Sequence, residues 1–156
     1  MATPEFILEL RKNIGHAALS LPSVTAVVFG EGGRVLLNRR SDDGRWSLLA
    51  GVLEPGEQPA AGAVREVFEE TAVDIVVERI VAVEALPLRT LQNGDQVYWF
   101  ETVFACRAVG GDARVNDDES LEVAWFEPAV MPALDERQTR YLAMARDVAA
   151  PPFFVG

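Results

Sequence analysis

The stretch LLAGVLEPGEQPAAGAVREVFEETAV, Leu48–Val73, carries the pattern that decides the fold of this chain. Pro59 suits the first position of a helix, where its missing N–H needs no partner. The pattern therefore predicts a helix over residues 59–71, with Gln58 at its N-cap. Apolar residues at helical spacing are expected to form its packed face; they are Ala60, Val64, Val67, Phe68 and Thr71.

Three glutamates crowd the other side of this predicted helix. Glu66, Glu69 and Glu70 stand at positions i, i+3 and i+4, so their side chains are neighbours. Arg65 lies four residues before Glu69 and can pair with it along the helix edge. Two carboxylates ~6 Å apart repel by about 3 kcal/mol at an effective dielectric near 20. A divalent cation that prefers oxygen ligands, such as Mg²⁺ or Mn²⁺, would reverse the sign of this energy. The alternative is an acidic helix face that is simply solvated.

The segments on either side of this stretch predict strands and two further helices. Two β-branched runs, residues 24–29 and 34–38, read as a hairpin with a glycine-rich turn. Further strands are expected from residues 74–86, with a break near Glu78 and Arg79, and from residues 97–109. A last strand is expected over residues 123–128 and a helix over residues 134–149. The order predicts one layered domain of mixed α/β class spanning residues 1–156.

Residues 3–19 are expected to form an amphipathic helix, within an N-terminal extension over residues 1–20. Its apolar face, which packs on the domain or on a second subunit, is expected to contain Phe6, Ile7, Leu10 and Ile14. His16, the only histidine, is expected to be structural or exposed. A homodimer through this helix is one option that the sequence leaves open.

The charge and the cysteine count narrow the class of protein. The net charge of −10 disfavours binding to nucleic acid polymers and to anionic membranes. The N-terminus has no signal-peptide pattern, and no window is apolar enough to cross a bilayer. Cys106 is the only cysteine, which predicts a reducing compartment and a cytoplasmic location.

The spacing of the opening stretch resembles the Nudix box, written G-x5-E-x7-R-E-U-x-E-E-x-G-U with U an aliphatic residue. Gly51, Glu57 and the run Arg65–Val73 occupy its positions, and every charged position agrees. The flanking segments extend the resemblance to the Nudix, or MutT-like, hydrolases over residues 23–145. The resemblance implies the Nudix fold, an α/β/α sandwich with a mixed β-sheet.

The resemblance also implies an activity and a set of site residues. Nudix hydrolases cleave the pyrophosphate bond of a nucleoside diphosphate linked to another group, such as a nucleotide sugar like ADP-ribose or a (d)NTP, with Mg²⁺ or Mn²⁺. The metal ligands would be the carbonyl of Ala50 and the carboxylates of Glu66, Glu69 and Glu70. The catalytic group would be Glu66, Glu69, Arg65 and Glu119. Within it, Arg65 orients the carboxylates and Glu119, on a later acidic loop, serves as an additional ligand or base. Glu57 would pair within the loop–helix unit.

The segments in and around the box also suggest residues that could contact the substrate, and Ala72 departs from the box pattern. Arg39 and Arg45, with Arg40 between them in the lead-in, could meet phosphates. Aromatic residues could stack on a base or lie in the core; they are Trp46, Tyr98, Trp99 and Phe100. Ala72 stands where the box has its second glycine, and at a positive φ it would cost about 1 kcal/mol relative to glycine.

Two other functions remain open from the sequence. A Nudix-fold module that binds a nucleotide without cleaving it would be expected to have lost box carboxylates, and none is lost. An isomerase of isoprenyl diphosphates on a related fold would need a cysteine at the site. Cys106 falls in an expected core strand, so this function ranks last.

Overall fold

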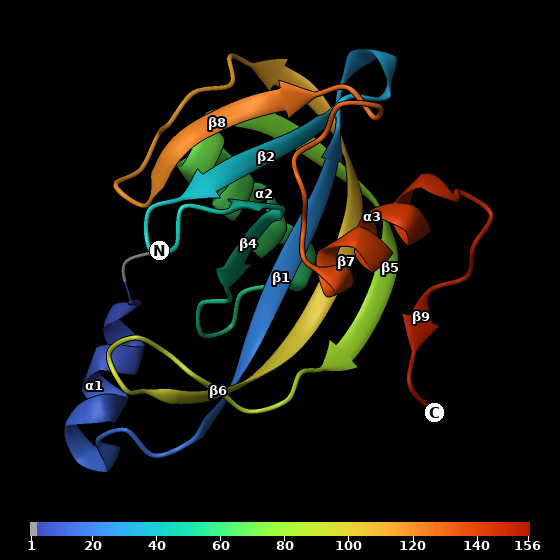
Figure 1. Ribbon diagram of the computed structural model, residues 1–156. Helices are drawn as coiled ribbons and strands as arrows, with labels where there is room; N and C mark the ends of the chain where they lie inside the picture. The colour runs from blue at the N-terminus through green and yellow to red at the C-terminus, as the bar shows by residue number, and fades with distance from the viewer. Residues whose placement is uncertain (1–2) are drawn as a thin grey trace.

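The computed structural model describes residues 3–156, and its centre is one mixed β-sheet (Figure 1). The strands in the main path run in the order β3-β2-β1-β7-β5-β9. β1 and β7 are parallel, as are β5 and β9, and the other pairs are antiparallel. The strands are β1 (Leu19–Phe29), β2 (Val35–Arg40), β3 (Trp46–Ser47), β4 (Leu49–Val52), β5 (Val73–Ala85), β6 (Arg89–Thr90), β7 (Gln96–Gly111), β8 (Ser120–Phe126) and β9 (Phe153–Phe154).

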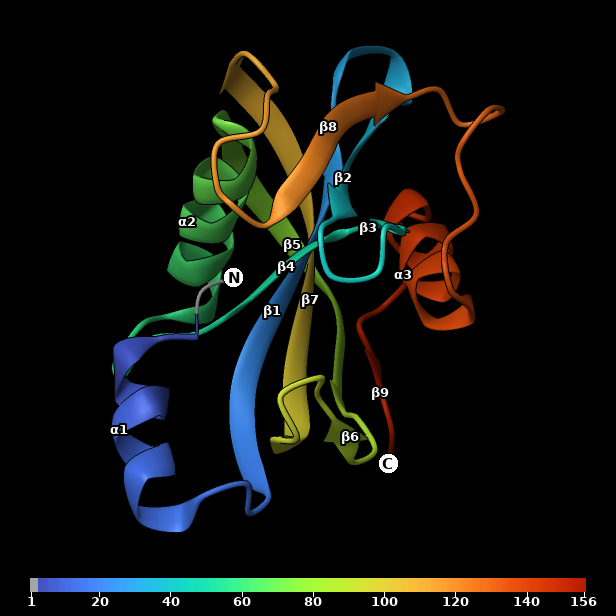
Figure 2. The same cartoon turned by 60° about the vertical axis from the view of Figure 1, so that its left-hand side comes forward.

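Helices lie on both faces of this sheet, which confirms the predicted α/β/α sandwich. The helices are α1 (Glu5–Ile14), α2 (Pro59–Thr71) and α3 (Glu136–Arg146), with a 3-10 turn η1 (Glu31–Gly33). Figure 2 shows α2 and α3 on opposite sides of the sheet. Among residues 3–156, no helix is both long and apolar enough to cross a bilayer.

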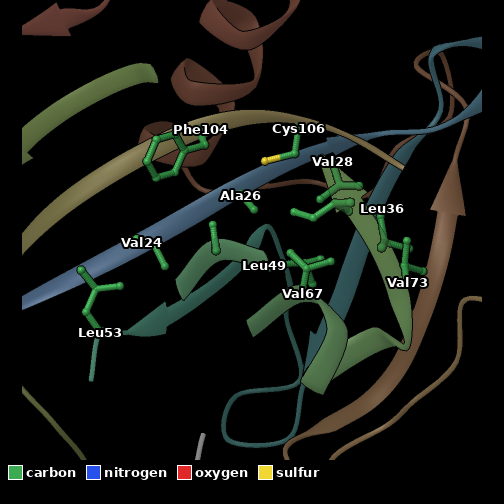
Figure 3. Close-up of a cluster of buried hydrophobic side chains, with 12 residues drawn as sticks. Val24, Ala26, Val28, Leu36, Leu49, Leu53, Val67, Val73, Phe104 and Cys106 are labelled. Carbon is green, nitrogen blue, oxygen red and sulfur yellow. The ribbon is translucent and has the colours of Figure 1, made fainter. Parts of the chain in front are cut away.

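The alternation of β7 divides the core between these two helices. Phe104 and Cys106 pack into the cluster that includes Val67 of α2 (Figure 3). Val103 lies in the cluster on the other face, which contains Tyr141 of α3. Successive strand residues point to opposite faces, so one strand supplies both cores. Cys106 therefore lies in the core, and burial raises the pKa of its thiol to about 12.

The pairing of β1 with β2 and with β4 brings both of these strands within reach of α2. β1 pairs with β2 near its end, at Phe29 and Val35, and with β4 over residues 23–26. The strands β2 and β4 therefore pair with β1 at different points along its length. Side chains of α2 reach both of them, since Glu70 contacts Asn38 of β2 and Glu66 packs on Gly51 of β4.

The element boundaries agree with the sequence in some places and correct it in others. The predicted hairpin is present, and α2 begins and ends where predicted. The N-terminal helix is shorter than predicted, ending at Ile14 before Gly15 at φ 56, and Leu19 already belongs to β1. The expected break near Glu78 and Arg79 is a register shift within a continuous β5.

The predicted packed face of α2 is only partly confirmed, because Val67 and Thr71 are buried but the other predicted residues are exposed. Val64 and Phe68 are 38% and 47% exposed, whereas Glu66 and Glu70 are buried together with Val67. Likewise, Leu10 and Ile14 of α1 are exposed, and only Phe6 and Ile7 of its predicted face pack against the domain. In α2 the face toward the sheet therefore includes two carboxylates, which the apolar periodicity alone assigned to the outside.

Candidate active site

The helix α2 positions the candidate site, and its two ends are held in different ways. Pro59 occupies the first turn, and Gln58 caps the helix without a side-chain hydrogen bond. At the other end Ala72 has φ 56 and ψ 26 and donates its N–H to the Phe68 carbonyl. Among residues 3–156, Ala72 is the only non-glycine residue with a positive φ. The concern raised by the missing box glycine is therefore real for this backbone.

Glu66 is held against the backbone of β4. Its side chain is 6% exposed, and a Cβ built on Gly51 would lie 1.9 Å from its carboxyl carbon. Only glycine leaves room for a carboxylate at this distance, which explains the first glycine of the box. Burial raises the pKa of Glu66, and the nearby charge of Arg65 offsets part of this rise.

Glu70 is the most strongly perturbed carboxylate of the site. It is 7% exposed, and Asn38 donates a hydrogen bond of 3.3 Å from Nδ2 to its Oε2. Burial raises its pKa to about 8, and the charges of Glu66 and Asp117 add to the rise. At neutral pH this carboxyl stays largely protonated unless positive charge is brought to it.

Arg65 is the cation that the other three carboxylates of the site share. Its guanidinium donates to both oxygens of Glu57 at 2.8 Å, to Glu66 at 2.9 Å and to Glu69 at 3.1 Å. It also donates to the carbonyl of Val52. The predicted pairs with Glu57 and Glu69 are confirmed, while Glu69 itself stays exposed. These pairs raise the pKa of Arg65, so it remains charged.

The acidic loop after β7 is anchored to the end of α2. The Arg114 and Asn116 amides donate to the carbonyls of Thr71 and Glu70 at 3.0 and 3.2 Å, so the loop supplies partners for the last turn of the helix. Asp117 then accepts from the amides of Glu119 and Ser120 through its side chain. These bonds hold the loop carboxylates beside the helix carboxylates.

Two adjoining hollows meet at this cluster of side chains. The smaller, of about 690 Å³, is lined by helix and loop carboxylates that include Glu66, Glu69, Glu70 and Glu119. The larger, of about 860 Å³, is lined by Ala50, Gly51 and Arg40 as well as by Glu70 and Glu119. Glu70 and Glu119 line both hollows. All the predicted metal-ligating and catalytic residues therefore lie on the walls of these two spaces.

The residues present fit a divalent cation that is completed by its ligand. Within residues 3–156, no three acidic, histidine or cysteine side chains converge tightly enough to form a cage for a metal ion by themselves. Mg²⁺ does not require such a cage, because it binds one or two carboxylates and fills its shell with water and phosphate oxygens. The buried Glu66 and Glu70, with raised pKa values, provide carboxylates that a cation would stabilise in the charged form.

The predicted substrate contacts are only partly at the site. Arg40 lines the larger hollow, but Arg39 and Arg45 line neither. Arg39 lies 3.3 Å from Glu122, without hydrogen-bond geometry at Nε, and Arg45 is exposed on the loop before β3.

The aromatic residues separate in the same way. Trp46 packs edge-on against Phe126 in the core. Tyr98 and Phe100 are 44% and 50% exposed. Trp99 lines the larger hollow and is the one aromatic of the four that does so.

Sequence reasoning missed two polar groups at the site. Asn38 and Ser23 are buried and line the larger hollow, and Asn38 Oδ1 and Ser23 Oγ have no hydrogen-bond partner among the described residues. An asparagine that follows the apolar run Val35–Leu37 was the available signal, because buried polar groups need partners.

Comparison with known proteins places this geometry in a family. Residues 19–146 match the family model described as NUDIX domain. A MutT-like protein from Streptomyces ambofaciens is 39% identical over 68% of this chain and 63% of its own length. An 8-oxo-dGDP phosphatase from Homo sapiens is 33% identical over 83% of this chain and 37% of its own length.

Solved structures show the same fold. The crystal structure of a UDP-X diphosphatase is 25% identical, with a TM-score of 0.65 over 91% of this chain and 70% of that chain. By contrast, the chain spans 63% and 37% of the two curated relatives above.

Proposed function

Because this chain belongs to the Nudix family, we propose that it hydrolyses the diphosphate linkage of a nucleoside diphosphate joined to another group, with Mg²⁺ or Mn²⁺ as cofactor. The observation that carries this proposal is the buried pair Glu66 and Glu70, whose pKa values are both raised. Such a pair is stabilised when a divalent cation and an anionic substrate enter together.

The chain offers a defined set of groups for this chemistry. Glu66, Glu70 and the carbonyl of Ala50 would hold the cation, with Glu69 beside them. When bound, the cation screens the charge of the diphosphate oxygens and makes a water a stronger acid.

The other site residues orient these ligands and handle the proton. Glu57 holds Arg65, and Arg65 in turn fixes the carboxylates of Glu66 and Glu69. Arg40 lies where a guanidinium can meet phosphate oxygens. Glu119, at the junction of the two hollows, accepts the proton of the attacking water.

The names of similar proteins support a nucleoside diphosphate as the common part of the substrate. One relative is named for 8-oxo-dGDP and one solved structure for a UDP derivative. Within this class, nucleotide sugars such as ADP-ribose and (d)NTPs are the substrates to try first. The substrate is a small molecule rather than a nucleic acid polymer or a membrane, and the reduced Cys106 suits the cytoplasm.

A substrate panel tests the proposal. The wild-type protein is incubated with ADP-ribose, UDP-sugars, dinucleoside polyphosphates and (d)NTPs, each with Mg²⁺, with Mn²⁺ and with EDTA. We expect metal-dependent release of a nucleotide product from one class. Glu66→Gln and Glu70→Gln should lower this activity strongly, whereas Glu78→Gln, at an exposed ion pair with Arg107, should leave it intact. Tight binding without turnover across the panel would instead favour a non-catalytic nucleotide-binding module.

A further inference from the structure

The helix α1 lies outside residues 19–146, the part of the chain that matches the family, yet it borders the site. One side of this segment lines the larger hollow; the lining residues are Thr3, Pro4, Ile7 and Arg11. Pro4 lines the smaller hollow as well. The other side of the helix faces solvent, with Leu8 50% exposed. The segment therefore has a pocket side and an outer side.

The docking of α1 on the domain is firm. Ile7 is 4% exposed and packs in a separate cluster with Leu21 of β1, Val52 of β4 and Val97 of β7. Burial of this apolar side chain stabilises the contact between the helix and the sheet. The helix is thus held in place over the strands that form the floor of the hollow.

Arg11 ties the end of α1 to the start of β7. Its Nη1 donates to the carbonyls of Gly15 and Ala17, and its Nη2 donates to the carbonyl of Gln96 at 3.1 Å. Its Nε lies 3.4 Å from the carboxylate of Asp95, and both side chains are only 10% exposed. One buried guanidinium therefore joins the helix, the following turn and the sheet.

Asp95 extends this connection to the loop between β5 and β7. Its carboxylate lies 2.8 Å from Nδ1 of His16, a contact that lowers the pKa of Asp95, and Asn93 donates to it at 3.0 Å. Its carbonyl accepts from the Leu91 amide. Residues 86–93 line the same hollow as α1. The helix and this loop consequently form one wall, joined at the pair of Arg11 and Asp95.

We propose that this wall selects the nucleoside of the substrate, and that Arg11 is the residue that holds the wall in position. The proposal rests on the proposed function for the place of the diphosphate, at the Glu70 end of the hollow. The same hollow is lined by apolar side chains of Ile7, Leu91 and Trp99, which suit the flat face of a nucleobase. Phosphates would meet the carboxylate end with its cation, and the base would meet the wall.

Two kinds of non-hydrolysable ligand test the nucleoside site and the diphosphate site separately. The α,β-methylene analogues of ADP, GDP, CDP and UDP carry a base, whereas methylenediphosphonate carries only the phosphorus groups. Their dissociation constants are measured by calorimetry with Mg²⁺. For Arg11→Ala we expect the best nucleoside analogue to bind about tenfold more weakly, because hydrogen bonds from a charged group that hold the wall are lost. Binding of methylenediphosphonate should stay within about twofold of wild type, since its site is untouched.

Matched variants keep the result interpretable. Lys12→Ala removes a neighbouring cation that pairs only with Glu9 among the described residues, and both ligands should bind as in wild type. Arg11→Lys should restore part of the affinity, because one ammonium cannot serve all the carbonyls. If Arg11→Ala does not fold, Asp95→Asn is expected to give the same selective loss.

Two results would contradict the proposed role of the wall in binding the nucleoside. One is equal weakening of both ligands, or of neither, in a folded Arg11 or Asp95 variant. The other is a wild-type protein that binds no nucleoside analogue more tightly than methylenediphosphonate. If the wild-type protein binds the analogues selectively but hydrolyses no substrate, the proposed function is contradicted. The proposed role of the wall in nucleoside binding is then still supported.

Discussion

The helices α2 and α3 lie on opposite sides of the sheet (Figure 2), and the carboxylates near these two helices differ in how their charge is balanced. On the α3 side, Glu84 pairs with Arg140 at 2.7 Å and Glu101 pairs with Arg137 at 3.0 Å. Burial raises the pKa of the Tyr141 hydroxyl, and the two carboxylates, both within hydrogen-bonding distance of it, add to the rise. Every acid in this group has its own cation.

On the α2 side the balance is different. Glu57, Glu66 and Glu69 share the single guanidinium of Arg65, whereas Glu70 accepts an amide hydrogen bond from Asn38 and forms no ion pair with another of the described residues. Buried charges are stable when they are paired and costly when they are not. The unbalanced group is therefore the one that we propose receives a cation. The balanced group needs none, although its Glu101 and Arg137 also line the larger hollow.

The largest expected effect is on catalysis at the unbalanced group. Glu70→Gln should lower kcat/KM by about 10²–10³-fold, which corresponds to about 3–4 kcal/mol of transition-state stabilisation. Tyr141→Phe, in the balanced group, should leave kcat/KM within about threefold. Steady-state kinetics on the best substrate of the panel gives both values, and similar losses in the two variants would erase the distinction.

The next effect is on stability as a function of pH. Glu70 has a pKa of about 8 in the folded chain against 4.5 for an ordinary glutamate, so the folded state holds its proton more tightly than the unfolded state. The free energy of unfolding without metal should therefore fall as pH rises from about 5 to 8, by a few kcal/mol. Urea unfolding in EDTA across this range measures the slope.

The control for this slope is Glu70→Gln. Since glutamine does not titrate, the variant should lose most of the dependence and be more stable than wild type at pH 8 without metal. A wild-type protein that gains stability over the same range would contradict the buried, unbalanced state of Glu70.

The balanced group should respond in stability alone. Tyr141→Phe removes a buried hydroxyl from two carboxylates, which should cost about 1–3 kcal/mol because charged acceptors lose a donor. Thermal unfolding of this variant measures the cost. A neutral result would mean that the two arginines alone satisfy Glu84 and Glu101.

The smallest effect is expected at the end of α2. Ala72→Gly should stabilise the protein by about 0.5–1 kcal/mol, because glycine adopts the observed positive φ without strain. The buried methyl of Ala72 sets an opposing loss, which keeps the gain small. The melting temperature should rise slightly with kcat unchanged. A fall in the melting temperature would show that the methyl group matters more than the backbone.

The sequence predicted the balance of charge at the site better than it predicted burial. Fixed spacing along one helix places Arg65 beside Glu69, and that pair is confirmed. Apolar periodicity failed for Glu66 and Glu70, because their burial depends on Gly51 and Asn38, which come from two other strands. Only the folded chain brings those strands to the helix.

Long-range pairing also decided the remaining errors. The N-terminal helix was predicted to run to residue 19, but Leu19 pairs with Val97 of β7 and so belongs to a strand. Arg39 and Arg45 lie near the box in sequence, whereas the arginines that line the larger hollow are Arg11, Arg40, Arg89 and Arg137. Nothing in the local sequence shows that α1 folds back over this space.

The most direct test of the central claim is the number of protons released when Mg²⁺ or Mn²⁺ binds. Calorimetric titrations at pH 7 in two buffers of different ionisation enthalpy measure this number. A cation that binds Glu70 must displace its proton, so the account predicts release of close to one proton from wild type and almost none from Glu70→Gln. Cation binding without proton release, or equal release from the two proteins, would contradict the claim that the unbalanced carboxylates await a metal ion.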